Sequence, residues 1–192
     1  MKDLADRRGV ETEVYQPAED SRLLAEAAVS HVTPDDRVLE VGTGSGYVAA
    51  TVAQETGARV VGCDVNPHAC VQARERGVEA VRTNLTDGFR DGSFDVVLFN
   101  PPYLPTEPAE EWDDWMEVAL SGGEDGRAVI EPFLDSVGRV LAPDGDVLLL
   151  VSTLTNLEAV RERAAHAGFD AETILEESYP FERLTIERLF QE

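Results

Sequence analysis

A short apolar run leads directly into three closely spaced glycines, and few folds accommodate this combination. Residues Val38-Leu39-Glu40-Val41 precede Gly42-Thr43-Gly44-Ser45-Gly46, and helix-forming residues then continue to Glu55. Glycine tolerates positive φ and lets the backbone approach a ligand closely. The pattern predicts a strand over Arg37–Val41, a tight turn and a helix over Gly46–Glu55. Its G-x-G-x-G spacing differs from the G-x-G-x-x-G spacing of dinucleotide binders.

Strand-like and helix-like segments alternate along the chain. We predict further helices over residues 20–32, with Asp20 or Ser21 as the N-terminal cap, and over Pro67–Arg76, Arg127–Leu141 and Asn156–Ala167. The other predicted strands are Ala58–Asp64, Val78–Arg82, Phe94–Phe99, Asp146–Ser152, Ala171–Ser178 and Leu184–Phe190. This alternation predicts an α/β fold with a doubly wound, mostly parallel sheet. Ligands of such sheets bind at the carboxyl ends of the strands.

Length and composition indicate one globular domain over residues 1–192. The chain is 43% hydrophobic, yet it contains no apolar stretch of the roughly 20 residues that a membrane span needs. The first eight residues lack the apolar core of a signal peptide, so we expect a cytoplasmic protein without a membrane partner. The two cysteines, Cys63 and Cys70, are too few for a disulfide framework or a zinc cluster, so no metal site is predicted.

The chain is strongly acidic. It has 38 acidic and 16 basic residues, for a net charge of −22, and the acidic residues are spread along the whole sequence. Dispersed charge argues against a disordered acidic tail. We interpret it as a surface adapted to high salt, which predicts a halophilic source.

Polar residues lie at or just after the carboxyl ends of two of the predicted strands. Asp64 ends the second strand, where an acidic residue can accept hydrogen bonds from both ribose hydroxyls of a nucleotide-like cofactor. Capping of the helix that starts at Pro67 is an alternative role for Asp64. Asn84 follows the third strand and is placed to meet an adenine amino group, although it can equally be an ordinary turn residue.

The fourth strand ends in Asn100-Pro101-Pro102-Tyr103. Two prolines fix φ and donate no N–H, so the turn is stiff. The Asn100 side-chain oxygen and the Pro101 carbonyl supply two acceptors for a planar –NH₂ group, and Tyr103 offers a flat face for stacking. This turn predicts a grip for a planar nitrogen that is to be modified, with Asn100, Pro101 and Tyr103 as catalytic residues and residues 100–103 as the substrate site.

These features together resemble a class I methyltransferase that uses S-adenosylmethionine and releases S-adenosylhomocysteine. The resemblance is carried by Glu40–Gly46, Asp64 and Asn100–Tyr103, and it implies the strand order 3-2-1-4-5-7-6 with an antiparallel last strand. It also implies a set of cofactor-binding residues, which comprises Glu40, Gly42, Thr43, Gly44, Gly46, Asp64, Val65, Asn84, Leu85 and Asn100.

The segment Val14–Ser21 resembles the one that folds over the methionine half of the cofactor in HemK-type protein-glutamine N5-methyltransferases. The resemblance therefore adds Tyr15, Pro17, Glu19, Asp20 and Ser21 to the expected cofactor contacts, within an arm over residues 1–20. Residues 121–127 resemble the family's Gly-Gly-x-Asp-Gly turn. Only a short stretch precedes Tyr15, which resembles the short archaeal and eukaryotic branch.

In that branch, the resemblance implies that the substrate is the glutamine of the Gly-Gly-Gln motif in a class I translation release factor. It also implies a heterodimer with a small zinc-binding activator protein, for which the edge strand Val78–Arg82 is the expected docking site. The acidic insertion over residues 101–123, with Trp112 and Trp115, is either a substrate-recognition element or a solvated loop.

The residue types also indicate a mechanism. An amide nitrogen is a poor nucleophile, so holding both of its protons and aligning it with the methyl group supplies much of the catalysis. Two other functions stay open from the sequence. The same turn suits an exocyclic amine of a flipped nucleic-acid base, although the chain lacks a basic surface or an added recognition domain. A non-catalytic subunit that only binds cofactor or a partner is the second alternative.

Overall fold

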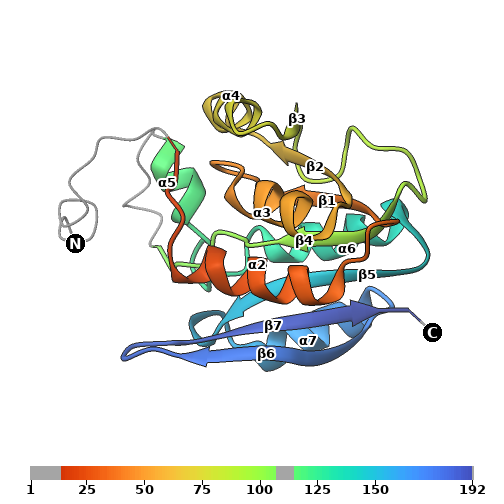
Figure 1. Cartoon of the computed structure of the whole chain (residues 1–192). Coiled ribbons are helices and arrows are strands. Elements are labelled where there is room, and N and C mark those ends of the chain that lie inside the picture. Colours follow the sequence, from red (N-terminus) through yellow and green to blue (C-terminus); the bar gives the residue numbers. More distant parts are fainter. Residues whose placement is uncertain (1–13, 107–114, 192) are drawn as a thin grey trace.

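The computed structural model describes residues 14–106 and 115–191, which form a single seven-stranded sheet with helices on both faces (Figure 1). The strands are β1 (Arg37–Val41), β2 (Arg59–Asp64), β3 (Glu79–Arg82), β4 (Phe94–Phe99), β5 (Leu141–Ser152), β6 (Asp170–Ser178) and β7 (Arg183–Phe190). Their order is β3-β2-β1-β4-β5-β7-β6, as predicted. Only β7 runs antiparallel to its neighbours β5 and β6.

The helices are α2 (Glu19–His31), α3 (Tyr47–Thr56), α4 (Pro67–Glu75), α5 (Trp115–Leu120), α6 (Ile130–Val140) and α7 (Leu157–His166), with a short 3₁₀ turn, η2 (Thr153–Thr155). Helices α2, α3 and α4 contribute to the core on one face of the sheet, and α6 and α7 pack on the other. The two cores use alternate residues of the central strands. Val96 and Leu98 of β4 face the first core, whereas Val97 and Phe99 face the second.

Helix α6 buries one apolar face against the sheet. Its apolar residues recur at the spacing of one helical face and are all buried: Ile130, Phe133, Leu134, Val137 and Val140. Burying each of the large side chains contributes about 1.5–3 kcal/mol. The Phe133 ring also contacts that of Phe99, with 4.4 Å between ring centroids, so α6 lies under the carboxyl end of β4.

Three of the predicted boundaries are wrong. Helix α2 begins at Glu19, its N-cap is Ala18 without a side-chain hydrogen bond, and the expected caps lie inside the helix. Helix α6 begins at Ile130 instead of Arg127. Strand β5 begins at Leu141 instead of Asp146, because Leu141 pairs with Phe94 before the register shifts at the turn that follows.

The insertion after β4 contains local structure that the sequence did not predict. It includes α5 and a bridge between Leu104 and Ser121. Residues 107–114, including Trp112, lie outside the described residues, as do residues 1–13 of the predicted N-terminal arm. Within the described part of the chain, no helix combines the length and the apolar character needed to cross a membrane.

Candidate active site

The glycine loop joins β1 to α3 with an unusual backbone conformation. Gly42, Gly44 and Gly46 have φ values of +65°, +52° and +75°, in the left-handed region that favours glycine. A Cβ at Gly46 would lie 2.8 Å from the Cα of Ala73, so this glycine is needed for the close packing of α3 on α4. A Cβ at Gly44 would meet no atom closer than 3.9 Å. The space over Gly44 is therefore open to a ligand.

Two carboxylates hold this loop in place. Asp64, at the end of β2, accepts hydrogen bonds from the backbone N–H groups of Gly44 and Asn66, each at 2.9 Å. Burial raises the pKa of Asp64, and these bonds oppose that effect. The alternative role of Asp64 as a helix cap is wrong, because Asn66 is the N-cap of α4 and accepts from the His68 N–H.

Glu40 lies beneath the loop and is almost fully buried. Its Oε2 accepts hydrogen bonds from the Thr43 hydroxyl at 2.5 Å and from the Ala49 N–H at 3.0 Å. Burial raises the pKa of Glu40 to about 8, although both hydrogen bonds favour the carboxylate. Glu40 thus connects β1, the glycine loop and the first turn of α3.

The segment before α2 reaches the glycine loop. The carbonyl oxygen of Tyr15 lies 3.9 Å from the position that a Cβ of Gly44 would take. The Tyr15 hydroxyl donates to Asp20, with 3.2 Å to Oδ2, and Asp20 Oδ1 accepts from the Ser21 N–H at 2.6 Å. Asp20 and Ser21 are buried, whereas Glu19 is exposed. The structure therefore places the predicted N-terminal segment beside the open space over Gly44.

Asn100 carries the most informative atom of the site. Its side-chain oxygen Oδ1 is buried and has no hydrogen-bond partner among residues 14–106 and 115–191. Buried polar atoms in folded proteins nearly always have a partner, and an unpaired one costs about 1–3 kcal/mol. The Asn100 backbone carbonyl lies 4.0 Å from the Cβ position of Gly42. An unused acceptor thus lies next to the glycine loop at the carboxyl edge of the sheet.

A second glycine-rich turn, residues 121–127, supports Tyr103. A Cβ at Gly126, where φ is +76°, would lie 2.7 Å from the Tyr103 carbonyl oxygen and 2.9 Å from Thr155 Cγ2. The Gly122 N–H donates to the Leu104 carbonyl at 2.9 Å, and Arg127 Nη1 donates to the Thr155 carbonyl at 3.0 Å. Residues 121–127 are therefore packed between the turn after Asn100 and η2. Sequence reasoning located residues 121–127 only by resemblance and did not find the role of η2.

The other predicted cofactor residues, Val65, Asn84 and Leu85, lie beyond the carboxyl ends of β2 and β3. Leu85 has a φ of +45°, and its carbonyl accepts from the Cys63 thiol at 3.3 Å. The Val65 carbonyl accepts from Arg82 Nε at 3.0 Å, and Asn84 is exposed. Their contact with a cofactor stays a prediction. Among the described residues, no group of three or more potential metal ligands is assembled.

Comparison with known proteins places this site in a family. A family model described as a methyltransferase domain matches residues 38–123, which include the glycine loop and Asn100. A Methanocaldococcus jannaschii protein named as a candidate protein N5-glutamine methyltransferase is 36% identical over 91% of this chain and 90% of its own length. The Homo sapiens methyltransferase HEMK2 is 33% identical over 93% of this chain and 90% of its own length.

The chain belongs to the protein N5-glutamine methyltransferase family. A solved structure of similar shape is the E. cuniculi Mtq2–Trm112 complex, described as responsible for methylation of the eRF1 translation termination factor. It matches with a TM-score of 0.79 and 28% identity, over 94% of this chain and all of that chain. The expected class I fold, S-adenosylmethionine-dependent N-methyltransferase activity and cofactor are confirmed for this N5-glutamine methyltransferase.

The site suits that cofactor. The open space over Gly44 is bordered by the carboxylate of Asp64 on one strand end and by the backbone of Tyr15 on the other side of the loop. When bound, S-adenosylmethionine supplies a methyl group on a positively charged sulfur. Near this space the chain also presents Asn100 Oδ1, an acceptor that has no partner among the described residues.

Proposed function

We propose that the chain methylates the side-chain amide nitrogen of the glutamine in the Gly-Gly-Gln motif of a class I translation release factor. The observation that carries this proposal is the buried, unpaired oxygen of Asn100. A glutamine amide has two N–H groups in one plane, and Asn100 Oδ1 and the Pro101 carbonyl are acceptors for both. The relatives named as N5-glutamine methyltransferases, and the neighbour described as acting on a translation termination factor, support the same substrate.

Each residue of the turn has a defined role in this proposal. Asn100 and Pro101 fix the amide nitrogen by its two protons, and Tyr103 packs on the amide plane. Alignment of the reactants to within about 3–3.5 Å is worth several kcal/mol of the barrier. As the amide nitrogen bonds to the methyl carbon, whose bond to the sulfonium sulfur breaks, its N–H groups become more positive. Their hydrogen bonds to the two acceptors then strengthen, and one proton passes to water afterwards to regenerate a neutral amide.

In this proposal the cofactor lies over the glycine loop. Asp64 receives the ribose hydroxyls, which would compete for the oxygen that accepts from Gly44. Asn84, Val65 and Leu85 border the adenine, and the segment from Tyr15 to Ser21 covers the methionine half. Gly42, Gly44 and Thr43 approach the cofactor through the backbone, while Glu40 and Gly46 maintain the shape of the loop.

The test is mass spectrometry of an intact release factor after incubation with the chain and S-adenosylmethionine. We expect a mass increase of one methyl group on the Gly-Gly-Gln glutamine. Asn100→Ala should abolish this methylation while cofactor affinity, measured by calorimetry, changes little. Parallel incubations with DNA and RNA test the alternative substrates. Methylation of nucleic acid but not of the release factor would overturn the proposal.

We further propose that a small zinc-binding activator protein docks on β3, the edge strand predicted for this role. The edge is confirmed as such, since β3 ends the strand order. A groove of about 520 Å³ lies beside it, lined by Val61 of β2, Arg74 of α4 and residues 77–81. Val81 on the strand is 40% exposed. Strand β3 exposes one residue of each charge, Glu79 and Arg82. The opposite edge strand, β6, exposes only acidic charges, which repel one another and oppose strand addition: Asp170, Glu172, Glu176 and Glu177.

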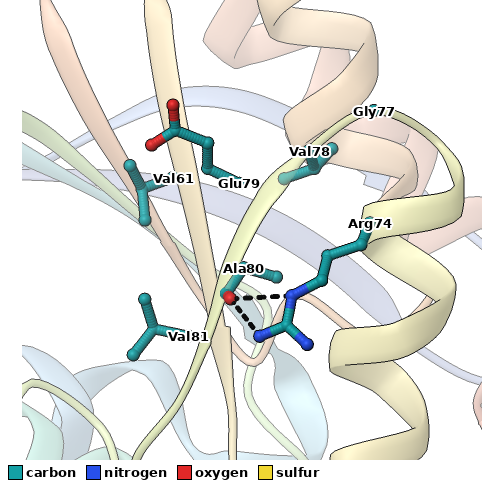
Figure 2. Close-up of a pocket in the computed structure, with 7 residues that line it drawn as sticks. All are labelled: Val61, Arg74, Gly77, Val78, Glu79, Ala80 and Val81. Carbon is teal, nitrogen blue, oxygen red and sulfur yellow. Dashed lines mark hydrogen bonds between the residues drawn. The ribbon is translucent and has the colours of Figure 1, made fainter.

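Arg74 occupies part of this edge. Its Nη2 and Nε donate to the Ala80 carbonyl at 2.6 and 3.2 Å. Figure 2 shows Arg74 reaching from α4 to this carbonyl, with Val61 on the far side of β3. A partner strand that pairs with β3 needs such carbonyls as acceptors. Partner docking through this carbonyl therefore displaces the Arg74 guanidinium.

Hydrogen exchange with and without the activator tests this site. We expect new protection over residues 78–82, and Val81→Asp should weaken the complex, whereas Ile174→Asp on the other edge should not. Arg74→Ala should leave the complex intact or tighten it, because the carbonyl no longer has a competing donor. Protection confined to another surface would refute docking on β3.

A further inference from the structure

The hairpin between β6 and β7 presents an aromatic side chain to solvent. Phe181 is 95% exposed, the highest value among the large hydrophobic residues exposed in the described part of the chain. A single exposed apolar residue is not unusual by itself. Phe181 differs from an ordinary exposed residue because it lies at the active-site edge of the sheet, on a turn that hydrogen bonds hold in place.

The hairpin tip lies at the same edge of the sheet as the active site. Strand β5 runs parallel to β4 and ends at Ser152, which pairs with Leu184 near the start of β7. The tip therefore projects beyond the carboxyl ends of β4 and β5, where Asn100 lies. Figure 1 shows the tip pointing to the side of the molecule that also holds α5 and the beginning of α2.

Hydrogen bonds hold the tip in one conformation. The Tyr179 N–H donates to the Glu182 carbonyl at 2.8 Å and closes the turn around Phe181. The Ser152 hydroxyl donates to Glu182 Oε2 at 2.6 Å, and the Arg183 N–H donates to Thr153 Oγ1 at 3.1 Å. An aromatic side chain on an anchored turn loses little entropy when a partner covers it.

Direct contacts connect the tip to the catalytic turn. Thr153 is the first residue of η2, and Thr155, the last, is packed against Gly126, which in turn contacts the Tyr103 carbonyl. Between them, Leu154 of η2 is 42% exposed. Tyr103, η2 and the hairpin tip thus form one continuous rim beside Asn100, with two exposed apolar side chains on it.

We infer that this rim, centred on Phe181 and Leu154, is a docking surface for the protein substrate outside its Gly-Gly-Gln motif. The inference rests on the proposed function, because a substrate larger than one glutamine side chain has to cover the surface around Asn100. Residues 176–183 contain three glutamates and one arginine, so the matching region of the substrate is an apolar pocket flanked by basic residues. At about 1 M salt the Debye length falls to roughly 3 Å, so only charges in direct contact add to the apolar contact at Phe181 and Leu154.

Steady-state kinetics on an intact release factor test the docking surface. The chain is assayed with the activator protein, as wild type, Phe181→Ser, Leu154→Ser and the control Ile174→Ser. Ile174 is 38% exposed on the same hairpin but lies four residues before the end of β6, away from the rim. We expect KM for the release factor to rise about tenfold in Phe181→Ser, and less in Leu154→Ser. The kcat value, the cofactor affinity and the thermal midpoint should stay at the wild-type level.

The outcomes separate the docking surface from the proposed function. An unchanged KM in Phe181→Ser, with active wild type, overturns the docking surface and leaves the proposed function intact. A fall in kcat without a rise in KM also overturns it, since the tip would then act on the catalytic geometry. An equal rise in KM for Ile174→Ser would show that the effect is not specific to the rim. A wild-type enzyme that does not methylate the release factor overturns the proposed function itself.

Discussion

Replacing Asn100 by leucine separates stability from catalysis at this site. Leucine has nearly the shape of asparagine but no polar atoms, so the substitution removes the buried, unpaired Oδ1 with little change in packing. An unpaired buried acceptor costs about 1–3 kcal/mol, and removal of such a group by a residue of the same shape is neutral or stabilising. Loss of a hydrogen bond made by the amide Nδ2 would offset about 1 kcal/mol of this gain.

We therefore expect the free energy of unfolding of Asn100→Leu to lie between the wild-type value and about 2 kcal/mol above it. For a domain of this size, that gain raises the thermal midpoint by about 4–8 °C at most. Removal of one acceptor for the developing positive charge should lower kcat by about 10²–10³-fold or more. A residue whose loss stabilises the protein and abolishes its activity is selected for function.

Denaturant unfolding, monitored by circular dichroism without cofactor, measures the stability, and methyl incorporation into the release factor measures the activity. Val97→Ala is a control in β4, the strand that Asn100 follows, because it creates a cavity in the core and should destabilise the protein. If the free energy of unfolding of Asn100→Leu is more than about 1 kcal/mol below that of wild type, Oδ1 is not an unsatisfied group. If its turnover is near normal, Asn100 is not the substrate acceptor.

Three further predictions concern the loop, the supporting turn and the surface. Because burial raises the pKa of Glu40 to about 8, the folded state binds this proton more tightly than the unfolded state. The contribution of the raised Glu40 pKa to the free energy of unfolding is therefore fully present below about pH 4.5 and is lost as the pH rises toward 8. The free energy of unfolding of Glu40→Gln should exceed that of wild type by up to about 3 kcal/mol at pH 7 and be similar to it at pH 5. If the two proteins show the same dependence of this free energy on pH, the pKa of Glu40 is not raised. Gly126→Ala should lower both the melting temperature and kcat, because its Cβ meets the Tyr103 carbonyl. Gly57→Ala, at the end of α3, with positive φ but no atom closer than 4.0 Å to its Cβ, should cost only about 1–2 kcal/mol and leave kcat unchanged. With a net charge of −22, the chain should unfold at lower temperature in dilute buffer than in molar potassium chloride; full stability in dilute buffer would contradict the halophilic interpretation.

Local sequence pattern was sufficient for the central part of the fold. The glycine loop and the ends of β1, β2 and β4 lie close to where their residues predict them. These elements are encoded by short-range rules, namely apolar periodicity and the φ freedom of glycine. The cap of α2 was predicted wrongly because the helix begins at Glu19, so Asp20 and Ser21 lie inside its first turn, where Asp20 Oδ1 accepts from the Ser21 N–H.

The early start of β5 shows a different limit. The segment after α6 contains Pro143, Asp144 and Gly145, which are typical of a turn. Pairing of Leu141 with Phe94 nevertheless extends the strand across it, with Asp144 at a φ of +64°. The start of β5 therefore depends on Phe94, which lies 47 positions before Leu141 in the sequence. The residues around Leu141 alone do not predict this pairing.

The sequence by itself determined the residue types of the site: glycines for the turn, an acid at the end of β2, and an asparagine held by two prolines. It also determined their order along strands whose carboxyl ends meet at one edge. Only the tertiary structure decided which groups have partners. It left Asn100 Oδ1 buried without one, gave Asp64 two backbone donors, and joined Tyr103 to Phe181 through Gly126 and η2. Hydrogen-bond satisfaction and solvent exposure depend on residues that are distant in the chain and adjacent in space, so they exist only once the sheet has assembled.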